Sequence, residues 1–426
     1  MVLPEQTTVL IVGAGPTGLS AAISLFEHGV KDLVIVDAVE RTPNTSRAMG
    51  IHAATLEALE TIGCSDKLVE LGIQSRSLDI WDRESRIFTL EMTPALESYT
   101  KYPYLLILTQ NKTEDVLEKH LKQPWSRYER GNTEVSFESG EVIKAQYVIG
   151  ADGARSVIRQ VNGINFADPD HVPVDDSLAQ VVLADVVFSS DKPILPKDRV
   201  IACVHDSAFS LVIPLPKACL EDSQEQIYRI VFNIPGARGA PPSNPQLSYL
   251  QERFDAVGLF ELTSNPNLNS EPVRITRCLW STRFRTHAAI ADKVVFRMHE
   301  RPDTLGGYVF LVGDAAHIHS PAGGQGMNLG IRDAIGLGSA LAEHLKTTAD
   351  KTLGLGIATP LQAYGEQRHK SALKVVRLTK RIMGVVAVLG GSSKVINLQY
   401  WFMRLLGSIP PVRRMIAWQV SGLGNR

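Results

Sequence analysis

The sequence has few cysteines and no long hydrophobic run. Its four cysteines, among 426 residues, form no CxxC pair, so neither a disulfide framework nor a structural zinc site is expected. The N-terminus has no basic segment before its short apolar run, which argues against a secretory signal. No apolar stretch approaches the roughly 20 residues of a transmembrane helix. These absences predict a cytoplasmic protein without a metal site.

An excess of charge of one sign is also missing. The 44 Lys and Arg residues nearly balance the 45 Asp and Glu residues, for a net charge of −1. No overall field favours nucleic acid, and the pair Arg413-Arg414 is expected on a solvated helix face. With 44% hydrophobic and 21% charged residues, the composition is that of a globular protein, long enough for two or three domains.

The N-terminal segment has the pattern of one βαβ unit. A β-branched run leads into the turn Gly13-Ala-Gly-Pro-Thr-Gly18, an apolar helical segment and a second β-branched run that ends at Asp37. Glycines in such a turn let the backbone approach a pyrophosphate, and the helix N-terminus that follows favours its negative charge. A carboxylate about 20 residues later can accept the ribose hydroxyls. The pattern predicts a dinucleotide site but does not distinguish NAD from FAD.

A second glycine-rich turn, near the other end of the chain, distinguishes FAD from NAD. An apolar strand ends at Gly313-Asp314, where a carboxylate can bind a ribityl hydroxyl. The loop 323–328 then exposes backbone N–H groups at the start of a helix, which stabilises negative charge. A reduced flavin carries negative charge near N1 and its C2 carbonyl, so this pattern favours FAD.

Between these motifs the chain changes character. From about residue 170 to 285, strand-like runs alternate with Pro, Gly and Asp, with little helical periodicity. We therefore predict an α/β fold, in which a Rossmann-like FAD-binding domain with a parallel sheet is split into residues 1–168 and 291–350. A mainly antiparallel substrate domain (169–290) is inserted, and a helical region (351–426) follows. The apolar stretch 375–406 fits a helical cap, a homodimer contact or a membrane contact equally well.

Three motifs resemble, in this order, those of a known family. The βαβ unit ending in Asp37, the segment Asp152-Gly-Ala-Arg-Ser156 and the segment Gly313-Asp-Ala-Ala-His317 are similar to the motifs of single-component FAD-dependent aromatic hydroxylases, the p-hydroxybenzoate and phenol hydroxylase group. The resemblance covers nearly the whole chain. It implies a monooxygenase that uses NADPH or NADH and O2 to hydroxylate a phenolic or electron-rich small molecule through a flavin C4a-hydroperoxide.

The resemblance also implies roles for individual residues. Pro321 would lie beside the flavin ring. The candidates for a base that helps to deprotonate a phenol are His205, Tyr228 and His287, in or beside the strand-rich region. The residues implied to bind FAD are Gly13, Gly15, Pro16, Gly18, Asp37, Ala38, Arg47, Gln110, Asp152, Arg155, Gly313, Asp314, Pro321, Gly324, Gly326, Met327 and Asn328.

The chain departs from the family pattern in two places. Before Tyr147 there is room for one hairpin but not for the additional strand that normally joins the sheet near the adenine. An insertion between Val294 and Gly307 is expected to form a surface loop near the cofactor. Since either feature could weaken FAD binding, a catalytically silent, flavin-free relative is one alternative function.

Other chemistries of the same fold form a second alternative. Epoxidation and Baeyer–Villiger oxygenation fit the sequence as well, whereas halogenation is disfavoured because no tryptophan is followed by another two positions later. The H-x-H pair His317 and His319 is expected to serve packing and backbone hydrogen bonding, because no third metal ligand stands at a fixed spacing.

Overall fold

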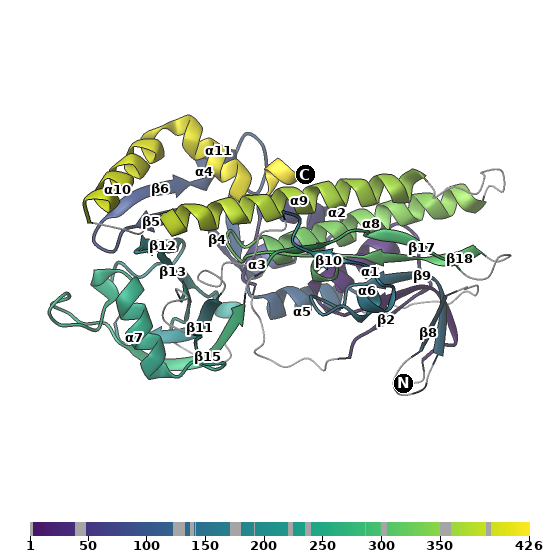
Figure 1. Ribbon diagram of the computed structural model, residues 1–426, viewed down its shortest axis with the longest axis horizontal. Coiled ribbons are helices and arrows are strands. Elements are labelled where there is room, and N and C mark those ends of the chain that lie inside the picture. The colour runs from purple at the N-terminus through teal and green to yellow at the C-terminus, as the bar shows by residue number, and fades with distance from the viewer. Residues whose placement is uncertain are drawn as a thin grey trace.

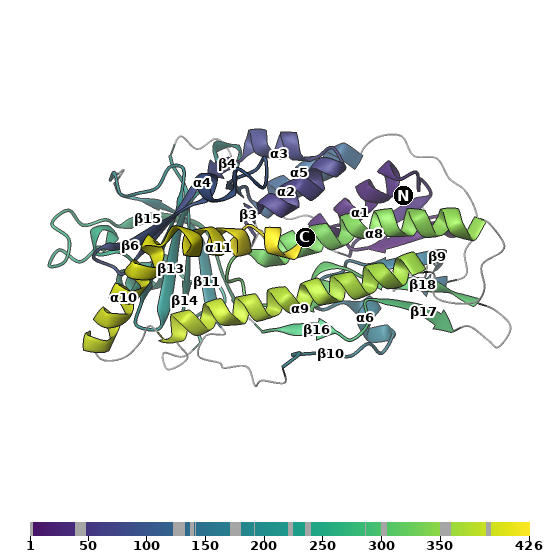
Figure 2. The same ribbon diagram turned by 90° about the horizontal axis from the view of Figure 1, so that it is seen from above.

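The computed structural model describes residues 3–38, 48–121, 133–136, 140, 142–170, 180–190, 192–219, 225–234, 240–285, 287–299, 305–349, 359–388 and 393–426. A largely parallel sheet lies toward one end of the elongated molecule and a mostly antiparallel sheet toward the other (Figure 1). The long helix α9 (Thr359–Val388) runs alongside both of them, as Figure 2 shows from above.

The first sheet has the strand order β17-β18-β9-β1-β2, with β8 paired to β9. Its strands are β1 (Gln6–Val12), β2 (Leu33–Val36), β8 (Thr133–Ser136), β9 (Val142–Gly150), β17 (Val295–His299) and β18 (Leu305–Leu311). Strands β2, β1, β9 and β18 are parallel, and their register places Val12, Gly150 and Leu311 side by side. The three glycine-containing motifs, which follow these residues, therefore meet at one edge of the sheet.

Helices bury the apolar strands of this sheet, which explains their continuous hydrophobic runs. Helix α1 packs directly against α8, where the Ser24 hydroxyl donates to Ile335 O at 2.8 Å and Gly338 leaves no room for a side chain. The other helices of this part are short. The bounds are α1 (Pro16–Glu27), α2 (Ala53–Thr61), α3 (Ser65–Leu71), α4 (Met92–Leu96), α5 (Gln110–Leu121), α6 (Val157–Val161) and α8 (Gln325–Ala349).

Two three-stranded sheets and several 3-10 turns lie outside the two large sheets. The small sheets have the orders β3-β7-β4 and β10-β16-β19. Their strands are β3 (Gly50–Ile51), β4 (Ile73–Ser75), β7 (Leu105–Ile107), β10 (Phe166–Ala167), β16 (Ala289–Ala291) and β19 (His317–Ile318), and the 3-10 turns are η1 (Lys217–Cys219), η3 (Phe260–Leu262), η4 (Gly313–Ala315) and η5 (Leu423–Asn425).

The second large sheet has seven strands in the order β15-β11-β14-β13-β12-β5-β6. The strands are β5 (Ser77–Trp81), β6 (Arg86–Glu91), β11 (Gln180–Phe188), β12 (Val200–His205), β13 (Ala208–Pro214), β14 (Tyr228–Asn233) and β15 (Ile275–Arg285). All neighbours are antiparallel except β12 and β5. Because β5 and β6 come from residues 77–91, the sheet is not confined to the inserted segment 169–290.

Side chains alternate between two faces of the seven-stranded sheet. On the outer face, Val182, Ile230 and Phe232 pack with Leu250 and Phe254 of α7 (Leu247–Val257). The inner face carries a separate apolar cluster that includes Leu183, Ile213 and Val231 together with Met49, Leu105 and Ile107. The inner face is thus the one directed toward the glycine-containing motifs.

The structure corrects one expectation about the first sheet. Residues 295–299 are β17, an edge strand antiparallel to β18, so the segment 294–307 is not simply a surface loop. The short segment before Tyr147 falls largely outside the described residues. The predicted domain bounds stay a prediction.

The C-terminal residues form two further helices, α10 (Ser393–Ser408) and α11 (Pro410–Val420). Helix α10 packs on β6, where Gly407 lies so close to Phe88 that a Cβ atom would collide with its ring. In the described part of the chain, no helix is both long and apolar enough to cross a membrane.

Candidate active site

The first motif is a backbone turn that only glycine can make. Gly13 has a φ of +107°, and a Cβ atom there would overlap the carbonyl of Ala151. A Cβ on Gly18 would overlap the carbonyl of Gly13, so α1 can approach the strand only because Gly18 has no side chain. Gly15 differs, because its Cβ would meet nothing within 4 Å. The space beside Gly15 is where a bound group can reach the backbone.

The start of α1 places partial positive charge beside the open space at Gly15. Gly15 occupies the N-cap position without a side-chain hydrogen bond to the helix, and Pro16 begins the first turn. The partial positive charge of the helix N-terminus is therefore not neutralised by a capping side chain. Asp37, which follows β2, accepts a hydrogen bond from Ala14 N at 2.6 Å through Oδ2, and both Asp37 and Ala38 are exposed at this edge.

The second motif follows β9. Asp152 accepts from Ile158 N at 3.1 Å through Oδ2, while its other oxygen, Oδ1, is buried without a hydrogen-bond partner. Arg155 is exposed. The sequence analysis missed Arg159, a buried residue whose guanidinium donates to Ala154 O and to Ala315 O, both at 2.8 Å. Arg159 therefore ties the second motif to the third.

The third motif is held by a buried carboxylate that the sequence analysis also missed. Asp333 of α8 accepts from Gly313 N at 3.3 Å and from Arg368 Nε at 2.7 Å, and lies 2.5 Å from His317 Nε2. Burial alone would raise the pKa of Asp333, but Arg368 and His317 lower it below its usual value. Asp333 thus stays ionised and holds the turn that presents Asp314, which is exposed.

His317 and His319 do not act as a pair. His317 binds the Asp333 carboxylate, a contact between side chains that the sequence analysis did not foresee. His319 is 2.8 Å from Ser320 O through Nδ1, and burial lowers its pKa to about 4. Among the described residues, no group of three or more His, Cys, Asp or Glu is arranged to hold a metal ion.

The loop before α8 is fixed by one asparagine. The side chain of Asn328 accepts from His52 N at 2.8 Å and donates to Gly50 O at 2.8 Å and Gly324 O at 2.7 Å. Gly324 has a φ of +62°, and a Cβ on Gly326 would meet nothing within 4 Å. The loop therefore leaves open space at the N-terminus of α8. Pro321 and Met327 are partly buried beside it.

His52 is a further residue at this loop that the motifs did not reveal. Its ring lies 3.6 Å from the position of a Cβ on Gly324, and its Nδ1 atom is buried without a partner. Burial, and after it the nearby charge of Arg332, lower the pKa of His52 to about 3, so the ring is neutral at physiological pH. No sequence motif marks His52, because its contact with the loop before α8 arises only from the packing of β3 and α2.

Gln110 and Arg47 are the remaining residues implied to bind FAD. Gln110 begins α5, with its backbone N bonded to Ala48 O at 3.0 Å and its side chain to Glu114 at 2.9 Å. It therefore lies next to the segment that leads to β3. Arg47 lies outside the described residues.

These features fit a dinucleotide cofactor. Two glycines border open space at the N-termini of α1 and α8, on the same edge of the sheet, and the buried Oδ1 of Asp152 lacks a partner beside them. Side chains at Gly15 or Gly326 would occupy that space. The arrangement offers one helix N-terminus to a pyrophosphate and another to a second region of negative charge.

The inner face of the seven-stranded sheet adds a charged pair. Arg229 of β14 and Asp185 of β11 form two parallel hydrogen bonds of 2.6 and 2.7 Å, and the guanidinium lies 5.1 Å from the Trp280 ring centroid. The sequence showed no distinctive charged cluster in these strands because the two residues are 44 positions apart. Pairing of β11 with β14 brings them together among apolar neighbours.

The three candidate bases are not on that face. Tyr228 belongs to the outer cluster and packs on Phe188 at 5.6 Å. His205 has the same strand parity as Cys203, another member of that cluster, and burial together with Arg83 lowers its pKa. His287 is exposed after β15. Strand alternation therefore turns Tyr228 and His205 away from the inner face, and their assignment as bases stays a prediction.

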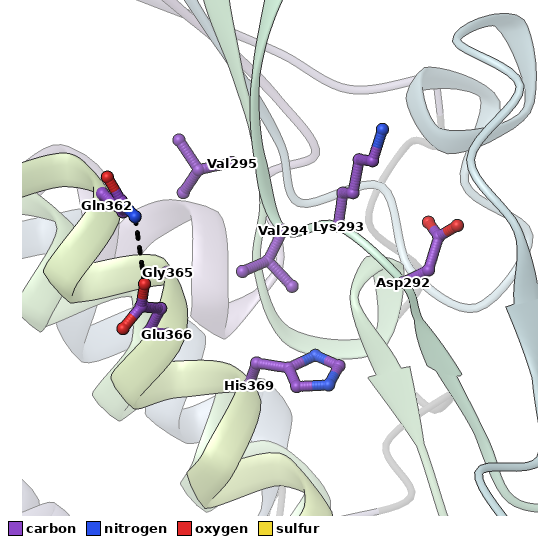
Figure 3. Close-up of a pocket in the computed structure, with 8 residues that line it drawn as sticks. All are labelled: Asp292, Lys293, Val294, Val295, Gln362, Gly365, Glu366 and His369. Atoms are coloured by element: carbon purple, nitrogen blue, oxygen red, sulfur yellow. Dashed lines mark hydrogen bonds between the residues drawn. The ribbon is translucent and has the colours of Figure 1, made fainter. Parts of the chain in front are cut away.

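A surface cleft of about 270 Å³ lies apart from these motifs (Figure 3). It separates Lys293 and Val294 from His369 of α9, and Gln362 donates to Glu366 at 3.1 Å on its helical wall. Ile382, which borders Gly323, is 13 residues farther along α9, about 20 Å on an ideal helix. The cleft is therefore not part of the glycine-lined site.

Comparison with known proteins decides which cofactor the site holds. The profile of a family described as FAD binding domain matches residues 6–231 and 280–379, more than half of the chain. The chain belongs to the FAD binding domain family. FAD is therefore the cofactor of this chain, as the charge pattern around residues 323–328 predicted.

Similar proteins place this FAD-binding chain among monooxygenases. An uncharacterized aromatic compound monooxygenase of Bacillus subtilis (strain 168) is 29% identical over 98% of this chain and 75% of its own length. Pentachlorophenol 4-monooxygenase of Sphingobium chlorophenolicum is 30% identical over 79% of this chain and 58% of its own length. The chain is an FAD-dependent monooxygenase of the aromatic hydroxylase class.

A solved structure shows the same fold. The crystal structure of p-nitrophenol 4-monooxygenase PnpA from Pseudomonas putida DLL-E4 has a TM-score of 0.75 at 23% identity, and the match covers 99% of this chain and 100% of that chain. The predicted combination of a split Rossmann-like FAD-binding fold with a mainly antiparallel sheet is thereby confirmed. The individual roles of the implied FAD-binding residues stay predictions.

Proposed function

We propose that this FAD-dependent monooxygenase takes electrons from NADPH or NADH and inserts one oxygen atom of O2 into a phenolic or similarly electron-rich ring. The observation that supports this substrate class is the inner face of the seven-stranded sheet. There an apolar surface, an indole ring and the Arg229–Asp185 pair are directed toward the cofactor side. The chlorinated phenol named for one relative is a ring of this kind.

The chain's contribution to cofactor chemistry is binding and charge. The first turn of α1 and the space at Gly15 would hold the pyrophosphate of FAD, and Asp37 would accept hydrogen bonds from its ribose hydroxyls. The N-terminus of α8 would favour negative charge on the pyrimidine side of the flavin. When bound, FAD supplies the electron transfer and the activation of oxygen.

The inner face orients the substrate and keeps water out. Leu183, Ile213 and Val231 form the buried apolar layer that excludes water on this side, and Trp280 offers a stacking partner to the ring. Arg229 attracts the phenol oxygen and favours its phenolate form, which is the better nucleophile. In this scheme no side chain needs to act as a strong base.

The experiment follows NADPH and NADH oxidation by the purified, FAD-loaded protein with phenol, 4-nitrophenol and pentachlorophenol, and with nitrobenzene as the matched ring without a hydroxyl. Products are analysed by mass spectrometry under isotopically labelled O2. We expect one phenol to accelerate oxidation and to gain one labelled oxygen atom, and nitrobenzene to do neither. A protein that takes up no FAD, or that oxidises NADPH equally with and without every phenol, contradicts the proposal.

Two variants on adjacent residues test the assignment of the faces. Arg229→Lys keeps the charge but loses the paired geometry, so kcat/KM should fall about tenfold while the bound-FAD spectrum is unchanged. Tyr228→Phe, on the outer face, should change kcat/KM by less than about twofold. An effect of Tyr228→Phe as large as that of Arg229→Lys would contradict the inner-face site.

A further inference from the structure

The balanced charge of the whole chain hides a strongly basic end. Residues 367–426 contain eleven Lys and Arg residues and no Asp or Glu. Because the whole chain has a net charge of −1, residues 1–366 carry −12. Such a separation of charge favours an anionic partner for the basic part.

Some of these cations are neutralised within the fold and others are not. Lys380 pairs with Asp168 and Asp170, and Arg404 pairs with Asp82 at 2.7 Å. By contrast, Arg381, Arg413 and Arg414 have no acidic partner among the described residues. The cations left without ion pairs include those at the end of α9 and on α11.

Helix α10 presents a row of large apolar side chains to solvent. Leu398, Trp401 and Phe402 are 65, 59 and 52% exposed, and Leu405 is 45% exposed. Their spacing of i, i+3, i+4 and i+7 puts them on one face of the helix. The opposite side is already used, since Tyr400 donates to Val204 O at 2.9 Å and Gly407 lies against Phe88. The exposed row is therefore not needed for the packing of α10 on the sheet.

The end of α9 continues this row. Val385 and Val388 are exposed, and Gln399 Nε2 of α10 donates to Val388 O at 3.0 Å, which joins the two helices. In both Figure 1 and Figure 2 α10 lies at one extremity of the molecule, beside the end of α9. We call the six side chains Val385, Val388, Leu398, Trp401, Phe402 and Leu405 the apolar ridge.

The charges near the apolar ridge decide between its possible occupants. A second copy meeting it through a two-fold axis would bring the arginines of this basic segment close to the same arginines of the other copy, which is unfavourable. Helices that lie in a membrane interface combine Trp, Phe and Leu on one side with Lys and Arg beside them. Arg381 lies one turn before Val385 on α9, and Arg413 and Arg414 follow α10 on the next helix, α11, so the C-terminal segment that carries the apolar ridge has that combination.

We propose that the apolar ridge docks this enzyme on an anionic lipid surface. Trp401 and Phe402 enter the headgroup region, and the unpaired arginines bind lipid phosphates. The buried contacts of Val386 and Tyr400 with Val204 attach this docking surface to the seven-stranded sheet. The sheet that carries the inner face, rather than the glycine turns, then lies next to the lipid.

The test is sedimentation of the FAD-loaded protein with vesicles of phosphatidylcholine alone or with about a quarter phosphatidylglycerol. We expect binding to the anionic vesicles and its loss in about 0.5 M NaCl. Trp401→Ser/Phe402→Ser should weaken binding at least about tenfold, because two buried aromatic contacts are lost. Leu268→Ser, at an equally exposed leucine remote in sequence, is the matched control and should bind as wild type.

A second pair of variants tests the charge. Arg413→Gln/Arg414→Gln should weaken binding about tenfold, at about 1 kcal/mol per cation, and Lys197→Gln/Arg274→Gln should not. Bound-FAD absorbance and circular dichroism show whether each variant is folded. If Trp401→Ser/Phe402→Ser misfolds, the single variant Phe402→Ser takes its place. Wild-type protein that ignores anionic vesicles, or ridge variants that bind as wild type, overturn the proposal. A dimer in solution that Trp401→Ser/Phe402→Ser dissociates would assign the apolar ridge to a second copy and overturns it too.

Discussion

The cofactor side and the substrate side of this enzyme are built in opposite ways. The cofactor side consists of short turns, each contiguous in sequence, that meet because parallel strands end at the same edge. The proposed substrate side is the inner face of a sheet whose strands come from residues 77–91 and 180–285. Its charged pair joins residues from two strands.

The difference determines what a single substitution can disturb. On the cofactor side the constraints are on backbone conformation, so glycines and one buried carboxylate hold several motifs at once. On the substrate side each strand contributes one or two side chains to a surface. We therefore expect changes on the cofactor side to cost both folding and FAD, and changes on the substrate side to affect turnover.

The largest difference should come from two carboxylates that pair with arginine, the buried Asp333 on the cofactor side and the partly buried Asp185 on the inner face. Asp333→Asn leaves the Arg368 charge buried without its partner, which should lower the free energy of unfolding by about 3–5 kcal/mol and weaken FAD binding. Asp185→Asn breaks the Arg229 pair on the substrate side and should leave the dissociation constant of FAD within about twofold of wild type. The measurements are urea unfolding and flavin fluorescence titration. Equal loss of FAD affinity in both variants would remove the distinction between the two sides.

A smaller contrast separates two glycines of the same turn. Gly18→Ala places a Cβ against the Gly13 carbonyl and should destabilise the protein by up to about 3 kcal/mol. Gly15→Ala meets no atom within 4 Å, so stability should change by less than about 1 kcal/mol while FAD affinity falls. Thermal unfolding of the apoprotein and FAD titration distinguish them, with Gly384→Ala as a control. A Gly15→Ala protein with wild-type affinity would show that no ligand approaches there.

The smallest effect is a pH dependence that arises on the cofactor side. The pKa of His52 is about 3 in the folded protein against 6.5 when unfolded, so the unfolded state binds more protons between these values. Stability is therefore full above pH 6.5 and is lost as the pH falls toward 3, by about 2 kcal/mol at pH 5. His52→Gln should flatten this slope in urea unfolding, and His287→Gln should not. An unchanged slope in His52→Gln would exclude His52 as its source.

Much of the fold and part of the site could be predicted from sequence because they depend on local patterns. The βαβ unit, the hairpin around Gly140 and the long helix after residue 324 all appear where the residues indicated them. The strand β17 was not predicted, because an edge strand forms through its pairing with β18 rather than through a pattern in its own residues. Asp333 and Arg159 also escaped prediction, since nothing in their neighbours marks a contact with the third motif.

Local sequence was sufficient to predict the glycine-containing turns at the strand ends, because glycine conformation, strand ends and helix N-termini are properties of neighbouring residues. Neighbouring residues do not determine which face of a strand is directed toward the cofactor side. Tyr228 and Arg229 are adjacent in sequence, yet one packs under α7 and the other lies beside Trp280. Only the packing of the sheet between α7 and the cofactor side decided this, because alternation along a strand defines two faces but not which of them is turned inward.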